Sequence, residues 1–390
     1  MVKGARPSVR DRLVTPPFVV ASLAHFLHAL AYYLFLSLPG FLRGLGASEV
    51  TIGALVGAAA AAAIVGRPPL GRVMDTRGRK VVMLVGGALA TGVCASYLLV
   101  DRLGPLLVGL RLLHGMAEAM LFASLFAFAA DIVPESRRIE GIALFGVSGL
   151  IPMALGGLVA DWLLQGGDYA RLFVMSATCS GVALMLTVVL RDVPPAEGHL
   201  PPRGVMSCVR QADLVPLWIV GLAFATALAG PVTFMKTFVM ETGAGSVGGF
   251  FAAYGLAAAT VRVVGSSLPD RVGPKRVLFP SLVTFMIGLA ILAFVRVGGG
   301  AAVVLGGLFC GTGHGFVFPI LLGLVIARAR PAERGAALSI FTALFDGGML
   351  VGGPLLGLVI RLAGYPAMYA TGLGIALVGV ALFARSDRGR

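Results

Sequence analysis

Long apolar runs recur along almost the whole chain, and they limit the possible folds more than any other feature of the sequence. A helix that crosses a bilayer uses about 20 apolar residues. Twelve runs of suitable length stand between charged residues or Pro and Gly breaks. They cover residues 17–38, 49–70, 81–100, 104–129, 141–162, 171–190, 214–235, 247–268, 277–295, 299–326, 335–360 and 364–384. The pattern predicts an all-α polytopic membrane protein with twelve transmembrane helices.

Composition excludes the main alternatives. Of the 390 residues, 58% are hydrophobic and 13% are charged, whereas soluble proteins carry about 25% charged residues. A soluble domain of this length would lack a charged exterior. The net charge of +13 does not indicate a nucleic-acid partner, because the basic residues are dispersed between apolar runs. No cluster of metal ligands or nucleotide-binding loop is present, so we expect no metal and no cofactor.

Lys and Arg are distributed unevenly among the loops. If the N-terminus is cytoplasmic, the cytoplasmic segments hold 22 of the 31 Lys and Arg residues, the outer loops hold six and the spans hold three. Cytoplasmic loops of membrane proteins carry such an excess. The sequence therefore predicts that both chain termini lie in the cytoplasm.

The two halves of the chain share an internal repeat. One set of polar and small residues recurs 195 positions later, as Arg67, Gly71, Asp75, Gly78 and Lys80 in one half and Arg262, Ser266, Asp270, Gly273 and Lys275 in the other. The pair Gly156–Gly157 recurs as Gly352–Gly353. Each half has six predicted spans, which is typical of parallel repeats about an axis along the membrane normal. We predict an N-terminal bundle at 1–190, a cytoplasmic linker at 191–213 and a C-terminal bundle at 214–390.

Two motifs identify a family resemblance. The loop after the second predicted span runs Gly71-Arg-Val-Met-Asp75-Thr-Arg77-Gly78-Arg79-Lys80. It resembles the cytoplasmic signature G-x-x-x-D-R-x-G-R-[RK] of the major facilitator superfamily, from which it departs at Thr76. The fourth span contains Arg111-Leu-Leu-His114-Gly115, which is similar to the family's R-x-x-Q-G motif. The resemblance implies two six-helix bundles related by a pseudo-two-fold axis, a monomer, and a bacterial inner (cytoplasmic) membrane location.

The same resemblance implies a gate at the cytoplasmic side. In the family, the loop signature holds the inner side shut while the outer side is open. A carboxylate at this place can accept bonds from a helix N-terminus and pair with Arg. The predicted cytoplasmic gate residues are Gly71, Asp75, Arg77, Gly78, Arg79, Lys80, Asp270 and Arg271. The alternative is that these basic turns only set the topology.

Ionisable residues inside spans are costly and usually functional. Arg111, His114 and Glu118 are spaced i, i+3, i+7 and share one helix face. Glu118 lies near the middle of its span and is the main candidate for proton coupling, with a fixed structural ion pair as the alternative. Asp346 lies similarly deep in the eleventh span. We set aside Arg67 and Arg262 as helix-end residues that snorkel or pair with the gate.

Three further histidines are candidates to line a cavity. His25 and His28 share a face of the first span, and His314 lies in a glycine-rich stretch of the tenth. Structural hydrogen bonding is the alternative for each. The predicted set for proton coupling or substrate binding is therefore Glu118, Asp346, Arg111, His114, His25, His28 and His314.

These features predict a secondary transporter that works by alternating access and is not an enzyme, because no hydrolase motif is present. The expected partners are a small-molecule substrate, protons and the lipid bilayer. Compact size and short loops resemble bacterial efflux members for drugs, sugars or metabolites, so we expect an efflux antiporter. Two alternatives remain: a proton-coupled importer of an organic acid or other small metabolite, and a non-transporting membrane sensor or scaffold.

Overall fold

The computed structural model describes residues 13–134, 137–191, 208–265, 267–295, 299–330 and 333–387, and these contain helices and no strands. Most of the predicted linker, residues 192–207, lies outside the described part of the chain. The helices are α1 (Pro16–Leu34), η2 (Phe35–Ser37), α2 (Leu38–Gly44), α3 (Glu49–Arg77), α4 (Arg79–Ser96), η3 (Tyr97–Leu99), α5 (Pro105–Ile132), α6 (Arg138–Leu163), η5 (Leu164–Gly166), α7 (Tyr169–Val189), α9 (Val215–Thr242), α10 (Val247–Val264), α11 (Leu268–Val272), α12 (Pro274–Ala293), α13 (Gly300–Arg328) and α14 (Arg334–Ser386).

Within the described residues, eleven helices are long and apolar enough to cross a membrane. The last of these covers 51 residues, or about 75 Å at the α-helical rise, far more than one bilayer crossing needs. It breaks at Gly364, where φ is 80° and ψ is 179°, values that glycine adopts readily. The break separates the eleventh and twelfth predicted spans. The prediction of an all-α polytopic membrane protein is confirmed.

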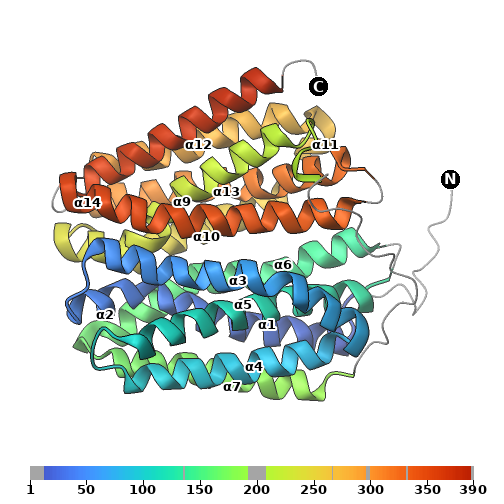
Figure 1. The fold of residues 1–390 in the computed structure, drawn as a ribbon, viewed down its shortest axis with the longest axis horizontal. Coiled ribbons are helices and arrows are strands. Elements are labelled where there is room, and N and C mark those ends of the chain that lie inside the picture. Colours follow the sequence, from blue (N-terminus) through green and yellow to red (C-terminus); the bar gives the residue numbers. More distant parts are fainter. Residues whose placement is uncertain are drawn as a thin grey trace.

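The helices form two groups that lie against each other (Figure 1). We call α1–α7 the N-terminal half and α9–α14 the C-terminal half. The end of the molecule where α1 begins and α14 ends, on the right in Figure 1, is the terminal end; the end where α3 begins and α9 ends is the opposite end. The two halves meet where α3 packs against α14 and where α6 packs against α10.

Glycines let the two halves approach closely toward the opposite end. A Cβ atom on Gly53 of α3 would overlap the backbone of Gly353 in α14, and one on Gly157 of α6 would lie 3.0 Å from Cα of Gly248 in α10. Gly53 and Gly248 are 195 positions apart, and Gly157 and Gly353 are 196 apart. The two close crossings therefore occur at corresponding positions of the internal repeat.

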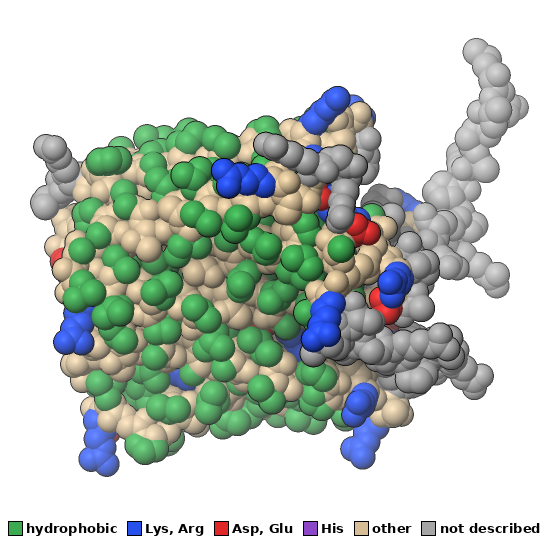
Figure 2. Space-filling model, turned by 45° about the horizontal axis from the view of Figure 1, so that its top comes forward, with side chains coloured by type: hydrophobic (Ala, Val, Ile, Leu, Met, Phe, Trp, Pro, Cys, Tyr) green, Lys and Arg blue, Asp and Glu red, His purple; other side chains and the backbone are tan. Residues whose placement is uncertain are grey.

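The surface fits a bilayer. Figure 2 shows hydrophobic side chains over the middle of the visible face and most Lys and Arg side chains toward its two ends. Large apolar residues such as Val189, Val264 and Phe294 are more than 70% exposed. Exposed apolar side chains over a broad area indicate contact with lipid rather than water.

A buried ion cluster fastens the last helix at the terminal end. Asp387, which follows α14, accepts bonds from Arg328 Nη1 at 2.6 Å and Nη2 at 3.1 Å, and Lys275 Nζ lies 2.7 Å away. Burial alone would raise the pKa of Asp387, but hydrogen bonds from Arg328 and Lys275 outweigh it and lower that pKa below its usual value. The cluster ties the end of α14 to α12 and α13.

Candidate functional site

Glu118 lies halfway along α5 and contacts a histidine of α1. Its Oε2 atom is 2.8 Å from Nε2 of His28. The His28 side chain is buried, whereas 26% of the Glu118 side chain is exposed. A carboxylate at this depth is costly unless it is paired or protonated. The sequence pattern singles out both residues but gives Glu118 the partners Arg111 and His114; the structure gives it His28 instead.

A second ion pair joins the two halves. Nη2 of Arg67 in α3 lies 2.7 Å from Oδ2 of Asp346 in α14, and 25% and 20% of these side chains are exposed. The two atoms lie within ion-pairing distance without the alignment of a hydrogen bond. Asp346 also lies close enough to Glu118 for their charges to repel. We call the region between the halves that contains Glu118, Arg67 and Asp346 the central region. Arg67, for which the sequence predicts snorkelling or pairing with the gate, thus lies in this region.

Arg262, the repeat counterpart of Arg67, lies in the C-terminal half. Its Nε donates to the backbone oxygen of Gly315 at 3.1 Å, and Gly315 stands near the middle of the 29-residue α13. Its charge interacts with the hydroxyl groups of Tyr254 in α10 and Tyr33 in α1. Tyr33 in turn lies within electrostatic range of Glu118. Arg262 therefore lies in the C-terminal half, within electrostatic range of a residue of α1 in the N-terminal half.

Aromatic rings surround His314 of α13. Its Nδ1 contacts the hydroxyl of the buried Tyr254, and its ring stacks with Phe345 at a centroid distance of 6.4 Å. Phe318 lies edge-on to both His314 and Phe345. His314, Phe318 and Phe345 are half-buried, so they present apolar and aromatic surface next to Asp346.

Arg111 and His114 make their direct contacts within the N-terminal half. Nε of Arg111 donates to the backbone oxygen of Leu55 in α3 at 3.0 Å, and the residue is buried. His114 is 2% exposed and packs edge-on against Tyr32 and Phe35. Arg111 and His114 thus have direct partners other than Glu118, because α5 contacts both α1 and α3.

His25 also has contacts inside the N-terminal half. Its Nδ1 lies 2.7 Å from Oγ of Ser148 in α6, and its ring stacks on Phe145 at 4.8 Å. Its side chain does not reach the carboxylate that His28 contacts. Among the described residues, no group of three or more His, Cys, Asp and Glu side chains could hold a metal ion.

The predicted cytoplasmic gate residues lie at the terminal end. Gly78 has φ of 86° and separates α3 from α4. Nε of Arg79 contacts Oδ2 of Asp131 at 3.1 Å and Lys80 donates to the backbone oxygen of Val188 at 2.9 Å. Arg77 and Arg271 are exposed, and a Cβ on Gly71 would meet open space. The side chains of Asp75 and Asp270 lie outside the described residues. The latch role stays a prediction.

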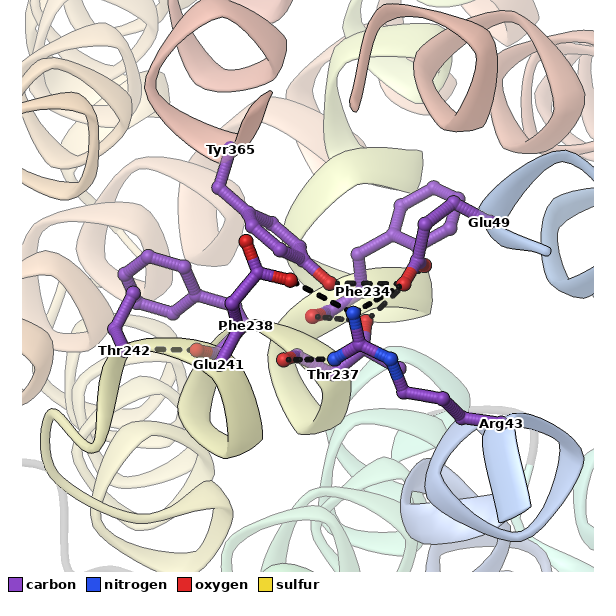
Figure 3. Close-up of polar contacts among 8 residues, drawn as sticks. All are labelled: Arg43, Glu49, Phe234, Thr237, Phe238, Glu241, Thr242 and Tyr365. Atoms are coloured by element: carbon purple, nitrogen blue, oxygen red, sulfur yellow. Dashed lines mark hydrogen bonds and ion pairs between the residues drawn. The ribbon is translucent and has the colours of Figure 1, made fainter. Parts of the chain in front are cut away.

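A polar cluster at the opposite end, drawn in Figure 3, is not predicted from the sequence. Nη2 of Arg43 in α2 lies 2.7 Å from Oε2 of Glu241 in α9 and 3.3 Å from Oε1 of Glu49 in α3. Glu49 also accepts bonds from Thr237 and Tyr365 of the C-terminal half, at 3.3 Å and 3.1 Å. We call these five residues the opposite-end cluster. The hydropathy pattern predicts only that Arg43 is a charged residue in a loop between two spans. Nothing in the local sequence indicates which residues it contacts.

A second polar contact joins the halves near that cluster. Oδ2 of Asp161 in α6 accepts a hydrogen bond of 2.6 Å from the backbone N–H of Gly248 in α10. Gly248 lies in the first turn of α10, where unpaired N–H groups and the helix dipole favour an anion. The opposite end is thus held by side chains at both places where the halves cross.

The chain matches the model of the Major Facilitator Superfamily over residues 21–331 and 217–390. It is 26% identical over 360 residues to an uncharacterized MFS-type transporter, YhhS, of Escherichia coli strain K12, covering 88% of this chain and 86% of that protein. The YhhS protein of Salmonella typhimurium strain LT2 is 27% identical over 365 residues, with the same coverage.

Two solved structures have a similar fold. The nucleoside transporter NupG superposes with a TM-score of 0.78 at 16% identity, covering 96% of this chain and all of that one. The human organic anion transporter MFSD10 (TETRAN) gives a TM-score of 0.72 at 19% identity, covering 95% of this chain and all of that one. At these identities the likeness describes the fold and not the substrate.

Proposed function

This chain belongs to the major facilitator superfamily, and we propose that it moves a small organic solute across the cytoplasmic membrane by proton-coupled alternating access. Its family makes it a multi-pass membrane transporter and not an enzyme. The finer assignment, to proton coupling at named residues, is supported by the polar groups that meet between its two halves.

The contact between His28 and Glu118 carries this proposal. The pair lies at mid-depth, and Glu118 is partly exposed, so a proton can reach it. With a proton bound, the pair is an imidazolium next to a carboxylate and is neutral overall; without it, the pair carries one negative charge. A buried pair without access to water would act only as a structural contact.

The ion pair between Arg67 and Asp346 can connect that proton to movement of the halves. This ion pair bridges α3 and α14. Asp346 also lies within electrostatic range of Glu118. A proton on either carboxylate lowers the repulsion between them, and a proton on Asp346 removes its attraction to Arg67. A ligand or proton shifts a two-state equilibrium only if it interacts differently with the two states. An ion pair that exists in one state and separates in the other meets this condition.

The arrangement supports assignment to an inward-facing state. The opposite-end cluster joins the halves through groups that include the buried Thr237 and Tyr365, whereas Glu118 and Asp346 remain partly exposed. Access to these carboxylates then comes from the terminal end. Because the excess of Lys and Arg assigns that end to the cytoplasm, we propose that both termini are cytoplasmic.

Efflux in exchange for protons is the direction that the sequence favours, through its resemblance to bacterial efflux members. Uptake of an organic acid together with a proton is the second candidate, and Arg262 favours it. A proton on Glu118 removes a negative charge from the region between the halves, so proton and anion would bind together. The fold neighbours suggest nucleosides or organic anions as solutes to test first.

The experiment is flux into proteoliposomes under an imposed pH gradient, with a pH-sensitive dye inside. Native protein should couple solute flux to proton flux, in opposite directions if it exchanges them, and reversing the gradient should reverse the net flux. Glu118→Gln and Asp346→Asn should abolish gradient-driven accumulation, while Asp101→Asn, a change of an exposed loop carboxylate, should not. Normal proton coupling in both site variants would refute the residue assignment. Inward solute movement with protons would favour uptake over efflux.

A further inference from the structure

We propose that Arg262 binds the negatively charged group of the substrate, which is an organic anion with an apolar or aromatic body. This inference rests on the proposed transport function and names its substrate class. Three independent observations carry it: the unbalanced charge of Arg262, the side-chain chemistry available to the site, and the aromatic surface beside it.

Arg262 has no carboxylate partner among the side chains that the structure describes. Glu118 has His28, and Asp346 has Arg67, the repeat counterpart of Arg262. Among the carboxylate side chains that the structure describes, none lies within ion-pairing distance of Arg262, and its one hydrogen-bond acceptor is the neutral backbone oxygen of Gly315. The repeat offset of 196 places an apolar residue, Leu150, where the C-terminal half has Asp346.

An unneutralised guanidinium at this depth is unfavourable, and an incoming anion would relieve that cost. The fork geometry of arginine suits it to carboxylate and other oxyanions, which can accept two parallel N–H bonds. Because Nε is already bonded to Gly315, the terminal nitrogens of Arg262 are the groups left to receive a ligand. The residue is only partly buried, so a ligand can reach it.

The remaining polar groups do not suit a polyhydroxylated solute. The sequence contains no Asn, and its two Gln residues lie away from mid-depth: Gln165 is exposed in the short helix η5 at the end of its span, and Gln211 precedes α9. Side-chain amides both donate and accept hydrogen bonds. They are therefore the usual side chains that recognise several hydroxyl or base groups of a solute at once. Without side-chain amides, the central region is better suited to recognise a charged group and an apolar body than the hydroxyl and base groups of a sugar or nucleoside.

Aromatic side chains supply the apolar part of the site. The half-buried rings of His314, Phe318 and Phe345 lie against one another beside Gly315, the residue that holds Arg262. Tyr33 approaches Arg262 from the N-terminal half. An anion bound at Arg262 would therefore lie next to aromatic surface, and both halves of the protein would contact it.

The test is binding to purified protein in lipid nanodiscs at a fixed pH, so that no gradient is involved. The probes are benzoate, phenylphosphonate, benzylamine and uridine, and their binding is measured by the shift in thermal unfolding. Benzoate or phenylphosphonate should bind, and benzylamine and uridine should bind much more weakly. Arg262→Gln should weaken anion binding by about tenfold or more, as expected for loss of a charged hydrogen-bond partner. Glu118→Gln should strengthen it, since a negative charge near the anion is removed.

Two control variants test whether anion binding depends on the guanidinium of Arg262 itself. Arg361→Gln removes an exposed charge of α14 and should leave anion binding unchanged. Arg262→Lys keeps the charge without the fork and should bind anions at an intermediate strength. Unchanged anion binding in Arg262→Gln, stronger binding of benzylamine or uridine, or no binding of either anion would overturn the inference. Because the assay uses no pH gradient, failure here leaves proton-coupled flux intact, and failure of coupling leaves anion binding intact.

Discussion

Arg67 of α3 and Asp346 of α14 form an ion pair of 2.7 Å that joins the two halves of the molecule near their centre. The two residues are separated by most of the chain, and the pair lies between the opposite-end cluster and the terminal end. It is therefore well placed to respond when the halves rotate against each other.

Exchanging the charges of this pair tests whether it couples the halves. Asp346→Arg and Arg67→Asp should each lower transport and thermal stability, because each leaves two like charges facing each other. The double variant should recover part of both losses. We expect an interaction energy of about 0.5–3 kcal/mol from the double-mutant cycle in detergent unfolding. Additive effects in the double variant would show that the two side chains act independently.

His28 should influence the pH dependence of transport, and His25 should not. The two residues lie one turn apart on α1, but His28 contacts Glu118 whereas His25 contacts Ser148. His28→Gln removes one site of the proton-binding pair, so the midpoint of the pH profile should move. His25→Gln is the matched control, which is expected to affect stability alone. Equal midpoint shifts in both variants would contradict the assignment of His28.

Arg43 should hold the opposite end closed. Arg43→Ala removes the contacts with Glu241 and Glu49, so the halves should separate there more often. The measurement is labelling of a Thr233→Cys side chain by a membrane-impermeant maleimide. Thr233 is 1% exposed and lies one turn before Thr237 on the same face of α9, and labelling should rise several-fold in the Arg43 variant. Lys236→Ala, a nearby basic residue outside the cluster, should leave labelling unchanged.

Asp387 should make stability dependent on pH in acid. Its pKa is lowered in the folded protein, so its contribution is fully present above the unfolded-state pKa, near 3.9. That contribution is lost as the pH falls through the lower folded-state pKa. Asp387→Asn should cost about 1.5–3 kcal/mol at neutral pH, the usual range for hydrogen bonds to a charged group, and should flatten the acid limb of the unfolding profile. The check is thermal unfolding in detergent from neutral pH down to about pH 3; an unchanged acid limb would refute the role of this carboxylate.

The sequence by itself determined that the chain crosses a membrane as helices. Backbone groups in lipid must be bonded within the segment, so each long apolar run was expected to be a helix, and the span boundary predicted between residues 360 and 364 matches the break at Gly364. The repeat was also readable, since Arg67 and Asp75 recur 195 residues later as Arg262 and Asp270. Glu118, Asp346, His28 and His314 were found because ionisable residues are rare inside spans.

Only the tertiary structure decided which of these groups meet. Helical periodicity assigns a residue to a face, but it does not say which helix packs on that face. For this reason Arg111 was expected to face Glu118 and instead bonds the backbone of α3, while Arg67 was set aside and instead pairs with Asp346. The contacts of the opposite-end cluster could not be predicted from the sequence for the same reason. Glu49 and Tyr365 are 316 residues apart, and only the packing of the two halves brings them together.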